Sequence, residues 1–143
     1  MKKIYNSKWF PRLFYTKPDG GKDSGVTAYF LIEWKILFSI GLLHFKKGTR
    51  EAYHSHAFHA LTWWLVGKVT EERILNPTFN KGISQKDFKP SFIPKYTSRD
   101  NFHKVISHKD TYALTFRGSW NDTWKEFKDN IYITLTHGRK ILN

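Results

Sequence analysis

His54 and His56 stand two positions apart in the segment GTREAYHSHAFH, which spans residues 48–59. In a β-strand this spacing places both imidazoles on the same face. Two ligands that project in parallel can close on one metal ion at about 2.0–2.2 Å. A third ligand from another strand would complete a facial set with open positions for water or substrate. The chain has seven histidines in 143 residues, so a close pair also arises by chance, and spacing alone leaves the metal site open.

His103 is the candidate for the third ligand, because it lies in a separate strand-like segment, Asn101–Ser107. His59 is the other candidate. Its odd separation from His54 and His56 turns it to the opposite face of a continuous strand, although a bulge near residues 57–58 would bring it back. His59 is thus either a substitute or supporting ligand, or a core histidine bonded to the backbone.

The elements that must position these histidines are short and rich in β-branched and aromatic residues, with Gly and Pro turns between them. This texture predicts an all-β chain of about eight antiparallel strands in a barrel or sandwich. Residues 76–98 read as a long loop with one short strand near Ser91–Lys95, and Asp122–Lys128 as at most one helical turn. The other expected strands are Val26–Trp34, Lys35–Phe45, Ala52–His59, Leu61–Val66, Lys68–Ile74, Asn101–Ser107, Tyr112–Arg117 and Asn130–Thr136.

The chain divides into an arm and a body. Residues 1–25 are expected to form an irregular N-terminal arm, because the stretch from Lys17 to Gly25 is rich in Gly, Pro, Asp and Ser. Residues 26–143 form the single β-barrel domain, a division that suits the length. Much of its aromatic content is expected to pack inside the barrel, namely Phe38, Trp63, Trp64, Tyr112 and Phe116.

Composition excludes several classes of function. The absence of Cys excludes disulfide frameworks, thiolate zinc sites and thiol catalysis. Apolar stretches are too short to span a bilayer and no signal peptide is evident, so we expect a cytoplasmic protein with no membrane partner. The net charge of +12 favours an anionic ligand, and nucleic acid is the less favoured alternative.

The histidine segment resembles the first conserved motif of the cupin superfamily. In that motif a Gly is followed after five residues by His-x-His, then by a Glu and a further Gly, which here correspond to Gly48, His54, His56 and Gly67. Ala60 or Leu61 stands where the family has its Glu ligand. The later His of the family's second motif is matched by His103. The resemblance implies an antiparallel cupin-type barrel, a double-stranded β-helix or jelly roll.

Further residues are similar to small single-domain cupin-like proteins of bacteriophages and bacteria. These features are the GKVTEE stretch at 67–72, His103-Lys104-Val105, and a Trp-centred turn that follows Gly118. The resemblance spans roughly residues 36–128. It places the protein in a bacterial or phage-infected cell, and it implies a homodimer by analogy with other cupins.

The resemblance implies a metal-binding protein that acts on a small molecule, and the net charge of +12 favours an anionic one. Whether the protein is an enzyme, and of what reaction, is left open. The cofactor would be a divalent transition metal (Fe, Zn, Mn or Ni) held by His54, His56 and His103. His59 is the less favoured candidate for a further ligand. Glu51, Glu71 or Glu72 could approach such a metal, although Glu71 and Glu72 are expected to pair at the surface with Lys68 and Arg73.

Trp120, Trp124 and Arg117 are candidates for ligand binding, because Trp beside Arg can stack a flat ring and hold a phosphate. The two Trp side chains could instead form a lid over the barrel. A non-catalytic alternative is a cupin that sequesters a nucleotide-like molecule, such as a phage protein that counters host signalling. A nucleic-acid binder is the third choice.

Overall fold

The computed structural model describes residues 10–19, 25–49, 53–76, 81–99, 101–128, 131–136 and 140–142. Every regular element in these ranges is a β-strand. No helix among the described residues has the length and apolar character needed to cross a membrane. The expected arm falls partly outside these ranges, at residues 1–9 and 20–24.

The strands follow one another through the whole described chain. They are β1 (Arg12–Pro18), β2 (Val26–Trp34), β3 (Phe38–Phe45), β4 (Gly48–Thr49), β5 (Tyr53–His54), β6 (Ala60–Val66), β7 (Val69–Asn76), β8 (Lys81–Phe88), β9 (Lys95–Thr97), β10 (His103–Ser107), β11 (Thr111–Arg117), β12 (Thr123–Lys128), β13 (Ile131–Thr136) and β14 (Lys140–Ile141).

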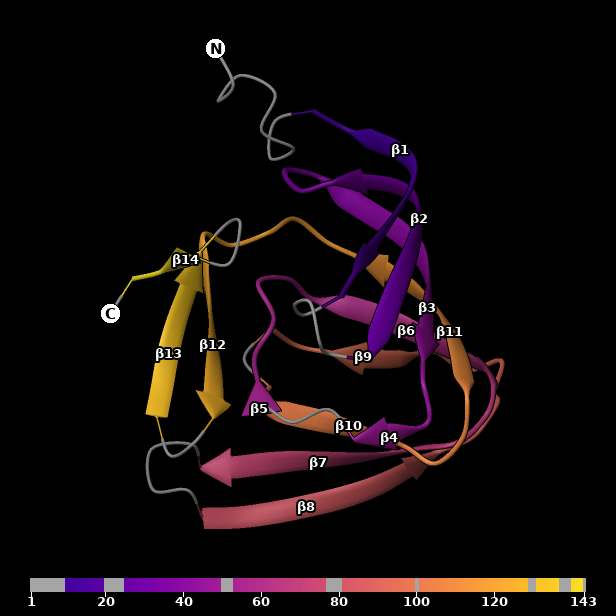
Figure 1. Cartoon of the computed structure of the whole chain (residues 1–143), viewed down its shortest axis with the longest axis vertical. Coiled ribbons are helices and arrows are strands. Elements are labelled where there is room, and N and C mark those ends of the chain that lie inside the picture. The colour runs from indigo at the N-terminus through magenta and orange to yellow at the C-terminus, as the bar shows by residue number, and fades with distance from the viewer. Residues whose placement is uncertain are drawn as a thin grey trace.

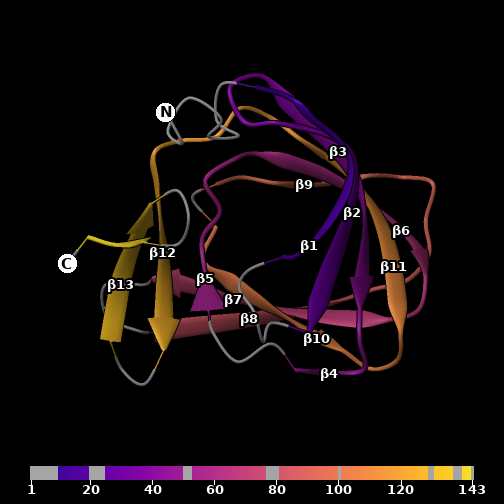
Figure 2. The same cartoon turned by 45° about the horizontal axis from the view of Figure 1, so that its top comes forward.

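Two antiparallel sheets make up the fold, as Figure 1 shows. The six-stranded sheet has the order β1-β2-β3-β11-β6-β9. The eight-stranded sheet has the order β14-β13-β12-β5-β10-β7-β8, and β4 pairs with β10 beside this path. The chain passes back and forth between the sheets, and the turned view in Figure 2 shows them facing each other around a common interior. The predicted antiparallel jelly-roll barrel is confirmed.

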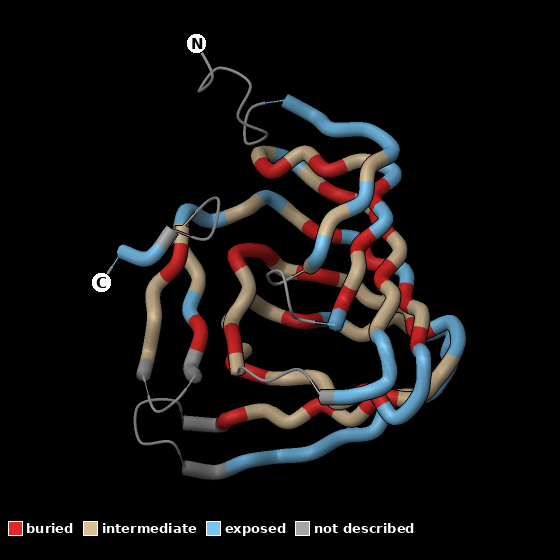
Figure 3. Tube along the Cα trace, in the orientation of Figure 1, coloured by how far each residue is buried: buried red, intermediate tan, exposed pale blue. Residues whose placement is uncertain are grey.

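The core lies between the sheets, and Figure 3 shows buried segments alternating with less buried ones along the strands. Alternate residues of β2 point into it, and Val26, Ala28 and Phe30 are at most 5% exposed. Val69 reaches the same cluster from the eight-stranded sheet and is fully buried. Burial of such side chains is the main force that holds the two sheets together.

Gly67 connects β6 of one sheet to β7 of the other. Its φ of +104° lies in the region that favours glycine, and a Cβ atom would overlap the side chain of Thr111. The Thr111 hydroxyl uses this closeness, because it accepts a hydrogen bond from the Lys68 N–H at 3.1 Å. The crossing between the sheets therefore requires a glycine.

Three segments differ from the sequence-based expectation. Residues 12–18, expected within the irregular arm, form β1 because they pair with β2 along its edge. The long loop expected at 76–98 contains β8, a polar strand that forms a hairpin with β7. Residues 123–128, expected to form at most a helical turn, form β12 between β5 and β13.

The expectation that the strand aromatics all pack inside was wrong for most of them. Only Trp64 lies in the core, at 7% exposed. Phe116 is 41% exposed, and it stacks on Phe38 with ring centroids 5.9 Å apart on the outer face. Tyr112 stacks in the same way on His44. The reason is that β11 presents its small and polar residues to the interior instead.

Candidate metal centre

The structure brings the three predicted histidines together. His54 in β5 is the direct register partner of His103 in β10. His56 follows β5, and the intervening Ser55 is fixed to Lys125 by hydrogen bonds in both directions, which keeps His54 and His56 on the same side. The candidate ligand atoms of the three side chains all lie within 4.8 Å of one another. We call His54, His56 and His103 the histidine triad.

The Glu71 carboxylate fixes the orientation of one ring. The His103 Nδ1–H donates to Glu71 Oε2 at 2.5 Å, because a carboxylate can only accept. The proton is thereby assigned to Nδ1, and the Nε2 lone pair of His103 is left facing the triad. His56 Nε2 lies 3.0 Å from His103 Nε2. Metal-binding histidines are commonly held by this kind of carboxylate contact.

Glu71 is itself buried and surrounded by cations. It is 4% exposed, Lys95 forms an ion pair with it, and Arg73 Nη2 lies 3.2 Å from its Oε1. Burial alone would raise the pKa of Glu71, but the His103 hydrogen bond and the Lys95 ammonium outweigh it and lower the pKa to about 2. The expectation that Glu71 pairs at the surface was therefore wrong. Its neighbour Glu72 does lie on the outer side, bonded to Tyr53, Gln85 and Lys104.

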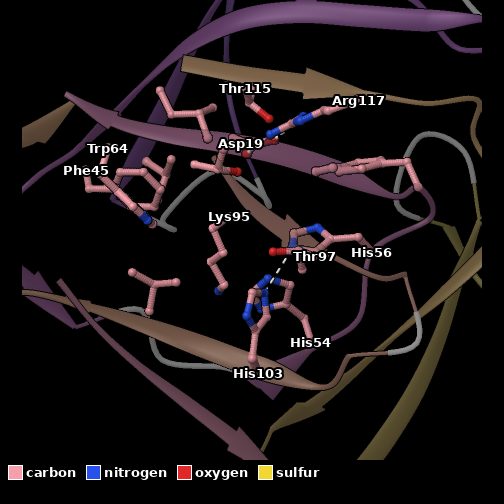
Figure 4. Close-up of a pocket in the computed structure, with 16 residues that line it drawn as sticks. Asp19, Phe45, His54, His56, Trp64, Lys95, Thr97, His103, Thr115 and Arg117 are labelled. Carbon is pink, nitrogen blue, oxygen red and sulfur yellow. Dashed lines mark hydrogen bonds and ion pairs between the residues drawn. The ribbon is translucent and has the colours of Figure 1, made fainter. Parts of the chain in front are cut away.

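The triad opens into a cavity of about 60 Å³ between the sheets. Figure 4 shows the histidines at one end, Trp64 and Phe45 at the other, and Lys95 between them. The walls combine apolar and polar side chains, namely Asp19, Val26, Leu43, Phe45, Phe58, Ala60, Thr62, Trp64, Lys95, Thr97, Val105, Thr115 and Arg117. The cavity wall thus mixes apolar and polar side chains, and apolar Phe58 stacks on His56 at the histidine end.

The donor set fits a divalent transition metal. Two nitrogens bound about 2.1 Å from one ion at a right angle are about 3.0 Å apart. His56 and His103 have this separation between their Nε2 atoms, 3.0 Å. Three neutral imidazoles, one of them oriented by a buried carboxylate, are ligands that suit Zn, Fe or Ni, whereas Mn prefers oxygen ligands.

His59 lies outside the triad. Its Nδ1 accepts a hydrogen bond from the Arg99 N–H at 3.2 Å and lies 3.0 Å from the Tyr96 hydroxyl. Both neighbours belong to the β9 region at the edge of the six-stranded sheet, where the His59 carbonyl also accepts from Gly118. His59 is therefore not one of the three clustered histidines, and its role as a ligand stays a prediction.

The three candidate ligand-binding residues are not all at the cavity. Arg117 lines it, and its guanidinium pairs with Asp19 at 2.7 and 3.3 Å. Trp120 and Trp124 pack edge to face on each other, against the buried cluster of Ala57, Phe58 and Ala60. This places them behind Phe58, which is itself part of the cavity wall. Their role in ligand binding stays a prediction.

Three residues of the site were missed by sequence reasoning: Asp19, Trp64 and Lys95. Glu71 was named as a carboxylate that could approach the metal, but it was expected to pair at the surface. Period-two alternation could have found Glu71, since it shares a strand face with the core residue Val69. Ile74, however, is buried as well, so the apolar residues of β7 lie on both parities and alternation does not choose a face. Asp19 carries no local signal, because its partner Arg117 is 98 positions away.

No protein-family model and no curated protein sequence matches this chain. Solved structures do. An acetylacetone dioxygenase from Acinetobacter johnsonii is 16% identical, with a TM-score of 0.53 over 90% of this chain and 76% of that one. The Cnp3 cupin domain of Schizosaccharomyces pombe is 12% identical, with a TM-score of 0.51 over 66% of this chain and 64% of that one.

A third neighbour is a variant of oxalate decarboxylase from Bacillus subtilis. It is 10% identical, with a TM-score of 0.56, over 77% of this chain but only 29% of that one. At such identities the likeness concerns the fold. The sheet order, the closed interior and these neighbours agree, and the chain therefore has the antiparallel jelly-roll fold of the cupins.

Proposed function

We propose that this protein is a metal-binding cupin that acts on a small anionic molecule through the histidine triad. The observation that carries the proposal is the contact between His103 and Glu71. The buried Glu71 carboxylate holds the His103 imidazole in a single tautomer. As a result, Nε2 of His103 faces the neighbouring His56. A histidine that served only to pack the interior would not need this arrangement.

A divalent transition metal, when bound, supplies Lewis acidity at the end of the cavity where the triad lies. The chain's own residues do the rest. His54, His56 and His103 occupy one side, which leaves positions toward the cavity open. Phe58, Val105 and the other apolar wall residues limit the water that can enter.

The charge of the cavity supports an anionic ligand. Lys95 and Arg117 both line it, and each already shares its charge with a carboxylate, Glu71 and Asp19 respectively. These four groups therefore balance, and a divalent cation on three neutral imidazoles would add uncompensated positive charge. A small anion in the cavity would compensate it.

The size of the cavity favours a small ligand. Pockets that enclose drug-sized molecules measure roughly 300–1,000 Å³. A space of about 60 Å³ is far below that range and cannot enclose a nucleotide. If the protein is instead a non-catalytic binding protein, its ligand is also a small molecule. A nucleotide does not fit inside the barrel.

Elemental analysis tests the proposal. Protein purified without an affinity tag is compared with the variants His54→Ala and His103→Ala, and with His59→Ala as the matched control. We expect about one transition-metal ion per chain in the parent and in His59→Ala. Both triad variants should lose it while circular dichroism still reports the folded β-structure.

A parent protein that holds no metal after Fe, Mn, Ni and Zn have each been added back would sink the proposal. So would a triad variant that folds and keeps its metal. In the first case the cavity would be studied as a metal-free binder of small anions.

A further inference from the structure

Two hydrogen-bond donors in the cavity wall have no acceptor. Trp64 Nε1–H and Arg117 Nε–H are buried, and neither has a hydrogen-bond partner among the described residues. Both side chains line the cavity, and they are 7% and 2% exposed. The remaining guanidinium nitrogens of Arg117 are taken by Asp19, so its Nε–H is the part left over.

Buried donors without partners are costly. A buried donor without a partner loses its hydrogen bonds to water and gains none in return, which is why native proteins rarely keep one. Trp64 lies at the end of the cavity opposite the triad, beside Phe45 (Figure 4). An acceptor atom inside the cavity would remove this cost. The Trp64 donor therefore indicates that the occupant has an oxygen at the end remote from the histidines.

The cavity also limits the size of its occupant. One water needs about 10–15 Å³ of such space. The volume of about 60 Å³ thus holds roughly four to six waters, so only a small molecule fits. Thr62, Thr97 and Thr115 are among the lining residues, and their polar side chains suit an oxygen-rich molecule.

We propose that the occupant is a short two-ended acid, a diacid or oxo acid of two to four carbons. One carboxylate lies at the triad beside Lys95, and an oxygen at the other end accepts a hydrogen bond from Trp64 Nε1–H. Arg117 Nε–H faces the same molecule from the side. The assignment of the first end rests on the proposed function, whereas the Trp64 end depends only on the cavity.

Calorimetric titration of the zinc-loaded protein tests this assignment. The probes are malonate, which has two ends, acetate, which has one, and adipate, which is too long. We expect malonate to bind at least tenfold more tightly than acetate, and adipate to bind no better than acetate. This length series uses the parent protein and needs no variant to fold.

The variant Trp64→Phe removes the indole N–H and keeps an aromatic ring. A hydrogen bond to a charged acceptor contributes about 1.5–3 kcal/mol, so malonate binding should weaken at least tenfold, while acetate binding changes little. Trp63→Phe is the matched control. Trp63 is opposite the exposed Leu114, on the outer face of the same strand, and its replacement should leave both affinities unchanged.

Unchanged malonate affinity in a folded Trp64→Phe variant would overturn the proposal. Equal affinities of the parent for malonate and acetate would do the same, and would leave ordered water as the partner of Trp64. Metal content is measured in the same samples. If none of Fe, Mn, Ni and Zn binds but Trp64→Phe still weakens malonate binding to the metal-free protein, the proposed function fails and this inference stands.

Discussion

Strands β11 and β2 belong to the same six-stranded sheet, but they place polar and apolar side chains differently. On β11 polar residues point inward and large apolar residues point outward, the reverse of the usual arrangement. On β11 the inward residues Thr115 and Arg117 are at most 2% exposed, whereas the outward residues Leu114 and Phe116 are 38% and 41% exposed. A sheet that only packs a core places its apolar residues inward. On β11 the interior is lined partly by polar side chains, and Arg117 there pairs with Asp19.

The same sheet has the usual arrangement on β2, although Phe30 lies close to Arg117, whose guanidinium carbon is 5.4 Å from the Phe30 ring centroid. On β2 the inward residue Phe30 is 2% exposed and belongs to the main apolar cluster, while Leu31 is 50% exposed. The inward residues of β2 contribute mainly to the apolar core, whereas Thr115 and Arg117 of β11 line the cavity. Substitutions in the two regions should therefore have different consequences.

The largest effect on stability is expected from Phe30→Ala. Removal of a buried Phe side chain leaves a void between the sheets and should lower the free energy of unfolding by about 3–5 kcal/mol. Urea denaturation measures it. Leu31→Ala, the neighbouring exposed position, should cost less than about 1 kcal/mol. Similar losses in both variants would mean that β2 does not have the inner and outer faces described.

Asp19→Asn is expected to have the next largest effect. The amide cannot balance the charge of the buried Arg117 guanidinium, so the free energy of unfolding should fall by about 1.5–3 kcal/mol. Thermal and urea denaturation give the value. Adding Arg117→Met should restore part of the loss, since the unpaired buried charge is then removed. No restoration would assign the loss to the β1–β2 turn and not to the ion pair.

Glu71→Gln should act on the metal centre. Residues that hold a metal ligand in place typically change metal affinity by about 10–100-fold when substituted. Competition with a chromogenic chelator measures this loss of affinity. Glu72→Gln is the control, because Glu72 is the next residue in β7 and bonds to Tyr53 and Gln85 on the other side. Equal metal affinities in the two variants would remove Glu71 from the site.

Phe116→Ser tests the outer face and should have the smallest effect, within about 1 kcal/mol, because surface substitutions rarely cost more. Urea denaturation at two protein concentrations makes the measurement. A loss comparable to that of Phe30→Ala, with a transition that depends on concentration, would show that this face is covered in solution. The predicted homodimer would then have its interface here.

The histidines and the fold could be predicted from sequence because their signals are local. The His-x-His spacing and the strand-forming composition each occupy a few neighbouring residues. The polar interior could not be predicted, because β11 alternates between Thr or Arg and large apolar residues, and the apolar set is the natural choice for the inside. The structure reverses this choice, as the exposed Phe116 and the buried Arg117 show.

Partners that lie far apart in the chain were missed for a related reason. Glu71 and His103 are 32 positions apart, and Asp19 and Arg117 are 98 apart. Neither pair leaves a pattern within a single window of sequence. β1, β8 and β12 were missed for the same reason, because each becomes a strand by pairing with a neighbour and has little apolar alternation of its own.

The register pairing of His103 with His54 also has a consequence for folding. These two residues lie 49 positions apart in the chain (103 − 54). The triad therefore exists only after the segment between them has closed into a loop. Contacts of this kind form slowly, because the chain loses entropy before the contact is gained. A metal at the triad would therefore bind the folded chain and not a local segment. Such binding should slow unfolding much more than it speeds folding.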